Sequence, residues 1–189
     1  MWRGLGNGTF QVFSSDHAPY SFDEHGKLAR STNPNFKEIA NGLPGLELRM
    51  PLLFSEGVLG GKIDIHRFVE LCCTNGAKVY GLHPKKGTIA IGSDADIALW
   101  DPEKTERITN ETTHDATGYS PYIGRTVTGW PTTVLSRGEV IVENGQFVGK
   151  KGRGQFLPRA AGPAAQPLGR LIPEMDPAHN FGAVMIEEV

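Results

Sequence analysis

A carboxylate and an imidazole follow a short apolar segment near the start of the sequence, in QVFSSDHAPY at residues 11–20. The apolar residues predict a short buried strand over 11–13, and Pro19 turns the chain into a loop soon after. An Asp or His at the carboxyl end of a strand can bind a metal ion or move a proton. Asp16 could equally cap a turn, because aspartate is a frequent capping residue. Evidence from the rest of the sequence is needed to choose between these interpretations.

His17 is a weaker candidate for metal binding than its neighbour. Adjacent residues at the end of a strand point to opposite sides, so Asp16 and His17 cannot easily face one ion. We therefore expect His17 to pack against a loop or to contact the residues that surround the site, without binding the metal itself.

Composition narrows the class of protein. The 189 residues can form one ordinary domain or two small ones, with 39% hydrophobic and 21% charged residues. A net charge of −2 gives no electrostatic support for nucleic-acid binding, and no apolar run reaches the roughly 18 residues of a membrane span. The cysteines, Cys72 and Cys73, are adjacent and poorly placed for a disulfide. These features predict a cytoplasmic protein without a nucleic-acid or membrane partner.

The first half of the chain has the pattern of a long loop followed by helices. Residues 20–45 show no sustained period, and a loop of this length inside a domain is usually functional. A helix is predicted over Glu47–Val58, with Pro51 as a kink or boundary. A second begins at the candidate N-cap Asp64, and a third near Asn75.

Short antiparallel strands are predicted after a boundary between Leu82 and Gly87. The segment DADIALWD, residues 94–101, alternates as a strand. Val140 and Val142, an Asn144-Gly145 turn and a following aromatic residue form the clearest hairpin signal. The chain is therefore of the α/β class, with two partial architectures.

Four stretches of the sequence resemble one enzyme family, in the same order along the chain. They are SSDHAP, NPNFKEIANGLPGLELRMPLLFSEGV, KKGTIAIGSDADIALWDP and TTVLSRGEVIVENGQFVGKKGRGQFLPR. Together they resemble the carboxyl-terminal portion of a dihydropyrimidinase or D-hydantoinase, in the cyclic amidohydrolase superfamily. The resemblance runs from about residue 2 to residue 159.

The resemblance implies a partial fold. Residues 1–83 would hold the last strand and following helices of a (β/α)8 barrel, and residues 84–159 the carboxyl-terminal strands of a β-sandwich domain. Residues 160–189 would form an extended tail or an oligomerisation arm. The family's His-x-His pair, its carboxylated lysine and two later metal-binding histidines have no match here. We therefore expect a fragment of an enzyme that is inactive as an isolated chain.

Site residues follow from the matching motifs. By resemblance, Asp16 is both catalytic and a metal ligand: it binds one of two zinc ions, which a carboxylated lysine absent from this chain would bridge. Asn41 is expected to bind substrate through its backbone. An Asn-Gly turn selected for positive φ is the other interpretation, and both can hold because such a turn exposes the backbone.

The implied activity is hydrolysis of the ring amide of dihydropyrimidines or 5-substituted hydantoins to N-carbamoyl amino acids. The partner is then a small cyclic amide, and the intact enzyme is expected to be a homotetramer of pyrimidine catabolism. Two alternatives stay open. One is an allantoinase- or dihydroorotase-like cyclic amidohydrolase, and the other is a non-catalytic dihydropyrimidinase-like assembly protein.

Overall fold

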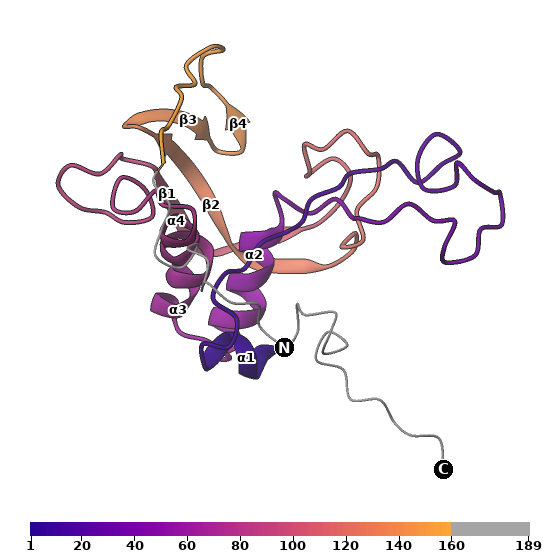
Figure 1. Cartoon of the computed structure of the whole chain (residues 1–189), viewed down its shortest axis with the longest axis horizontal. Coiled ribbons are helices and arrows are strands. Elements are labelled where there is room, and N and C mark those ends of the chain that lie inside the picture. Colours follow the sequence, from indigo (N-terminus) through magenta and orange to yellow (C-terminus); the bar gives the residue numbers. More distant parts are fainter. Residues whose placement is uncertain (160–189) are drawn as a thin grey trace, which may run out of the picture.

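The helices fall in the first half of the chain and the strands in the second (Figure 1). The computed structural model describes residues 1–159, so the predicted tail or oligomerisation arm over residues 160–189 lies outside the described residues. Within them the chain is a mixed α/β structure with a small antiparallel sheet. No helix in this part of the chain is long and apolar enough to cross a membrane.

Three helical segments precede the sheet. The α-helices are α1 Trp2–Gly6, α2 Arg49–Leu53, α3 Ile65–Val69 and α4 Asn75–Val79; π-helical turns η1 Phe54–Leu59 and η2 Glu70–Thr74 extend α2 and join α3 to α4. The predicted helix over 47–58 is thus confirmed, with Pro51 in its first turn, where proline costs little. The predicted cap is confirmed as well, because the Asp64 carboxylate accepts the Arg67 amide at 2.7 Å.

The sheet has four antiparallel strands in chain order. They are β1 Ile97–Arg107, β2 Thr126–Ser136, β3 Glu139–Glu143 and β4 Gln146–Phe147. Asn144 and Gly145 join the last two with φ values of 50° and 79°, as a two-residue hairpin turn requires. The predicted hairpin is confirmed.

The predicted buried strand over residues 11–13 is wrong. Gln11 and Val12 are exposed, and no strand among the described residues lies beside them. The Phe13 amide instead donates to the Leu71 carbonyl of η2 at 3.0 Å. A strand needs a neighbouring strand to pair with, which composition alone cannot reveal.

An aromatic cluster joins the helices to the sheet. Phe54 stacks on Trp100 of β1 with ring centroids 5.2 Å apart, and Phe68 meets both rings edge-on. Gly129 brings β2 onto the same cluster, because a Cβ there would lie 2.2 Å from the Phe54 ring. The helical region and the sheet therefore share one packed interface.

Candidate functional site

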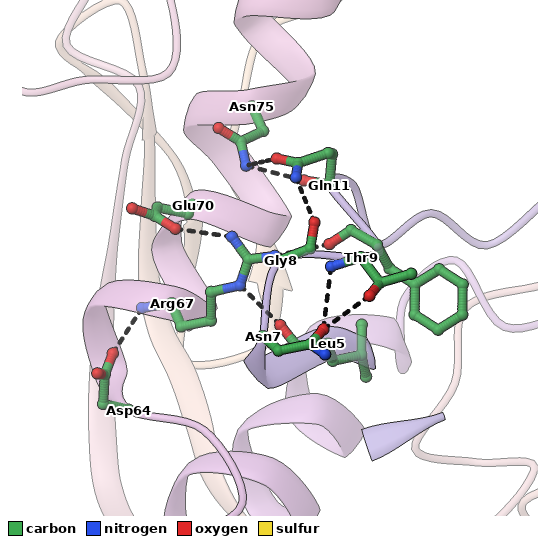
Figure 2. A network of polar contacts seen from close by, with 10 residues as sticks. Leu5, Asn7, Gly8, Thr9, Gln11, Asp64, Arg67, Glu70 and Asn75 are labelled. Carbon is green, nitrogen blue, oxygen red and sulfur yellow. Dashed lines mark hydrogen bonds and ion pairs between the residues drawn. The ribbon is translucent and has the colours of Figure 1, made fainter. Parts of the chain in front are cut away.

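The segment that leads to Asp16 is fixed by side chains from the helical region. Arg67 of α3 donates from Nε to the Leu5 carbonyl at 2.7 Å and from a terminal nitrogen to the Phe10 carbonyl at 2.6 Å. Its other terminal nitrogen pairs with Glu70 at 2.8 Å (Figure 2). One guanidinium thus ties the end of α1 and the start of the segment to α3.

Two further side chains continue this attachment toward the site. Asn75 donates to the Gln11 carbonyl at 2.9 Å, and Arg49 of α2 donates to the Phe13 carbonyl. The backbone of residues 10–13 is therefore held without a strand ladder. Helix side chains supply the hydrogen bonds that a neighbouring strand would otherwise make.

Asp16 stands at the end of this segment in an unusual backbone conformation. Its φ is 45°, in the left-handed region that L-residues rarely adopt, although aspartate tolerates it better than most. The side chain is exposed, and its carboxylate has no hydrogen bond or ion pair with any residue in 1–159. Within that range no amide donates to it as a cap would require. The carboxylate is free to meet a ligand.

The loop carrying Asn41 lies against the Asp16 segment. His17 Nδ1 accepts the amides of Gly45 and Leu46 at 3.2 Å and 3.3 Å, and the Ala18 amide donates to the Leu43 carbonyl at 3.3 Å. The expectation that His17 packs on a loop is confirmed. These bonds bring the two predicted site residues onto adjoining segments.

Gly42 allows this close approach. Its φ is 102°, and a Cβ there would lie 2.3 Å from the Cβ of Ala18. Positive φ and lack of space both require glycine at this position. The positive φ and the close packing at Gly42 therefore explain the glycine of the Asn41-Gly42 pair, and they are compatible with a backbone role for Asn41.

Asn41 presents unpaired backbone groups. Among residues 1–159 nothing hydrogen-bonds to its N–H or C=O, and its side chain is exposed. It lies at the edge of a hollow of about 500 Å³, which Arg30, Phe36 and Lys37 also line. A paired donor and acceptor of this kind complements an amide edge of a ring.

Lys27 holds the loop that carries Asn41, and it was not identified from the sequence. It is 5% exposed, and its ammonium donates to the carbonyls of Ala40 and Gly42 at 2.7 Å and 2.5 Å. A lysine in a polar loop has the sequence signature of a solvated surface residue. Nothing local marks a bond that spans 13 to 15 residues.

The predicted metal site can be compared with the described residues at one position, Asp16. Asp16 fits as one ligand, because an exposed carboxylate without a protein partner can bind a divalent cation directly. Within residues 1–159 no three His, Cys, Asp or Glu side chains come together to hold a metal ion. A catalytic zinc site takes three protein ligands, so Asp16 would need others.

A larger cavity lies away from both predicted residues. This apolar cleft of about 780 Å³ lies between the helices and β1, and Phe68, Cys72 and Trp100 line it. Neither Asp16 nor Asn41 reaches it. Burial raises the pKa of Cys72 to about 12, which suits a packing residue and not a nucleophile.

Comparisons with known proteins place these features in a family. The model described as "Amidohydrolase family" matches residues 1–141. D-hydantoinase from Ralstonia pickettii is 47% identical over 159 residues, 84% of this chain and 34% of the relative. D-hydantoinase from Streptomyces coelicolor is 46% identical over 85% of this chain and 33% of its own.

Solved structures give the same result. A D-hydantoinase structure aligns with a TM-score of 0.79 at 48% identity, over 85% of this chain and 34% of its own. Dihydropyrimidinase from Brevibacillus agri aligns with a TM-score of 0.80 at 44% identity, over 88% and 35%. The chain spans about a third of the length of these relatives.

Proposed function

Because this chain belongs to the amidohydrolase family, we propose that it supplies the carboxyl-terminal part of a metal-dependent cyclic amidase. The substrates would be dihydropyrimidines or 5-substituted hydantoins, opened to N-carbamoyl amino acids. The names of the similar proteins, D-hydantoinase and dihydropyrimidinase, support this class. The observation that carries the proposal is the docking of the Asn41 loop on the Asp16 segment through His17.

We propose zinc as the metal, and Asp16 would hold it as one ligand. When bound, two such ions lower the pKa of a water molecule toward neutrality. The fit of Asp16 rests on its exposed, uncommitted carboxylate.

The task of Asp16 in the reaction is to move one proton. Its carboxylate accepts a proton from the attacking water while the water oxygen bonds to the ring amide carbon. The ring C–N bond then breaks, and the same carboxyl group delivers the proton to the departing nitrogen. Atoms balance, since one water is consumed and a carboxylic acid and an amide nitrogen bearing one more hydrogen are formed.

Asn41 would orient the ring. Its N–H donates to a ring carbonyl, and its C=O accepts the adjacent ring N–H, a pair that a cyclic diamide offers side by side. The lack of competing partners for these groups within residues 1–159 supports this role. The ring is neutral, so hydrogen bonds from backbone atoms can bind it without a charged side chain.

Two alternatives compete with this proposal. An allantoinase- or dihydroorotase-like enzyme would share the superfamily chemistry, whereas a non-catalytic assembly protein would need no carboxylate at Asp16. The D-hydantoinase relatives at 46–47% identity favour the dihydropyrimidinase or hydantoinase proposal over both alternatives. We also propose that the intact enzyme is a cytoplasmic homotetramer that acts in pyrimidine catabolism.

A chimera tests the substrate class. Residues 1–159 would replace the matching third of Ralstonia pickettii D-hydantoinase, and the purified chimera would be assayed with dihydrouracil, a 5-substituted hydantoin, allantoin and dihydroorotate. We expect turnover of the first two. Preference for allantoin or dihydroorotate would overturn the substrate assignment, and zinc-loaded, folded protein without any turnover would favour the assembly role.

A further inference from the structure

We propose that Lys27 is a positioning residue for substrate, because it fixes and polarises the Ala40–Asn41 peptide whose N–H would meet the ring carbonyl. The inference rests on the proposed function in assigning that N–H to substrate. Its structural basis is independent of the reaction, since it concerns one buried ammonium and two carbonyls.

The charge of Lys27 lies beneath the loop without a counter-ion. No Asp or Glu of residues 1–159 forms an ion pair with it, and the side chain is 5% exposed. A buried ammonium needs compensation by hydrogen bonds or by charge. Here the compensation comes from the carbonyl dipoles of Ala40 and Gly42, on either side of Asn41.

Peptide geometry then determines where the Asn41 amide points. The single cis peptide among the described residues is His83–Pro84, so the Ala40–Asn41 bond is trans. In a planar trans peptide the C=O and N–H point in opposite directions. Because the Ala40 carbonyl faces the Lys27 ammonium, the Asn41 N–H must face away from it.

The same bond strengthens the amide as a donor. A carbonyl that accepts a charged hydrogen bond withdraws electron density from its peptide nitrogen, and linked hydrogen bonds reinforce one another. The Asn41 N–H should therefore bind a carbonyl oxygen more strongly than an ordinary loop amide. Lys27 would thus act on substrate through the peptide, without touching it.

Local structure holds Lys27 in place for this purpose. Its own amide donates to the Ser21 carbonyl at 2.8 Å, and a Cβ on the neighbouring Gly26 would lie 2.1 Å from that oxygen. The Asp23 carboxylate accepts from the Ser21 hydroxyl at 2.7 Å and from the His25 amide at 2.9 Å. The turn over residues 21–27 therefore aims the lysine at the loop.

The test uses the full 189-residue chain and NMR of its amides. Lys27→Met removes the donors and keeps the length of the side chain, and Lys27→Arg keeps charge and donors. Lys78→Met, on the exposed face of α4 away from this loop, is the control. We expect Lys27→Met to move the Asn41 amide upfield. It should also make the hydrogen-bonded amides of Ala18 and Gly45 exchange about tenfold faster.

Lys27→Arg should leave the Asn41 amide shift and the exchange rates close to those of the unmodified chain, and Lys78→Met should change neither. An unchanged Asn41 amide in Lys27→Met would overturn the proposal. If that variant does not fold, the unmodified chain decides: scalar couplings from Lys27 Nζ to the carbonyl carbons of Ala40 and Gly42 would support the proposal, and their absence would overturn it.

The chimera separates this inference from the proposed function. There, Lys27→Met should raise KM about tenfold with kcat changed much less, since it weakens a binding contact. If Lys27→Met shifts the Asn41 amide signal but leaves KM unchanged, Lys27 holds the loop in place. The proposed contact between Asn41 and substrate is then refuted. If Lys27→Met leaves the Asn41 amide shift and the exchange rates unchanged while the chimera is active, the role of Lys27 is refuted and the proposed function is not.

Discussion

His17 Nδ1 accepts the backbone amide of Gly45 at 3.2 Å. This bond joins the residue after Asp16 to the loop that carries Asn41, across 28 positions of sequence. Since Nδ1 accepts, the proton of the neutral ring is on the other nitrogen. The His17 imidazole therefore helps to attach the segment of the proposed proton carrier to the proposed substrate loop.

Gly42→Ala should disrupt this attachment. The added Cβ would overlap Ala18 at 2.3 Å and would also impose a φ of 102° on alanine. Gly92→Ala is the matched control, because Gly92 has a φ of 89° with nothing within 4 Å. We expect Gly42→Ala to cost about 1–3 kcal/mol more than the control in urea unfolding. Equal losses would show that the loop does not lie on Ala18.

Arg67→Met should loosen the segment that leads to Asp16. The substitution leaves the Leu5 and Phe10 carbonyls without their donor, which should lower the free energy of unfolding by about 2–3 kcal/mol. Lys78→Met, on the exposed face of α4, is the control and should change it by less than about 0.5 kcal/mol. Similar values for both variants would contradict the network in Figure 2.

Cys72 should resist alkylation in the folded chain. Burial raises its pKa to about 12, so almost all of the thiol is protonated at pH 8 and the reactive thiolate is scarce. In a Cys73→Ser background, iodoacetamide should label Cys72 far more slowly than in denaturant. Labelling of the folded chain at the rate of a free thiol would show that the cleft beside α4 is open to solvent.

Acid should weaken the turn that precedes β1. Hydrogen bonds from Lys85 and Lys86, at 2.7 Å and 2.9 Å, lower the pKa of the Asp94 carboxyl below its ordinary value of 3.8. A lowered folded-state pKa stabilises the fold above the ordinary value, and this contribution is lost as the pH falls through the folded pKa. Thermal unfolding from pH 7 to pH 2 should therefore depend less on pH in Asp94→Asn. An identical dependence in both proteins would refute the pairing.

Local signals in the sequence were sufficient for several elements. The Asp64 cap and the Asn144-Gly145 hairpin depend on residues within a few positions of one another, and both were predicted correctly. Helix and turn chemistry of this range can be obtained from composition and spacing.

Long-range relationships could not be predicted in the same way. The strand over residues 11–13 failed because pairing depends on a neighbour, and Lys27 was missed because its acceptors lie 13 and 15 residues away. Asp16 was a candidate from its position after an apolar segment, and family resemblance gave Asp16 and Asn41 their expected roles. The structure adds that His17 and Gly42 bring their segments together.

The central claim is that Asp16 binds metal and carries the proton in cyclic amide hydrolysis. The most direct test is zinc content and dihydrouracil turnover of the hydantoinase chimera with Asp16 and with Asp16→Ala, using exposed Glu103→Ala as the control. We predict bound zinc and turnover with Asp16 and with the control. With Asp16→Ala we predict a loss of about 10³-fold in kcat, because general acid–base catalysis contributes about 10²- to 10⁴-fold. Undiminished turnover in Asp16→Ala would contradict the account.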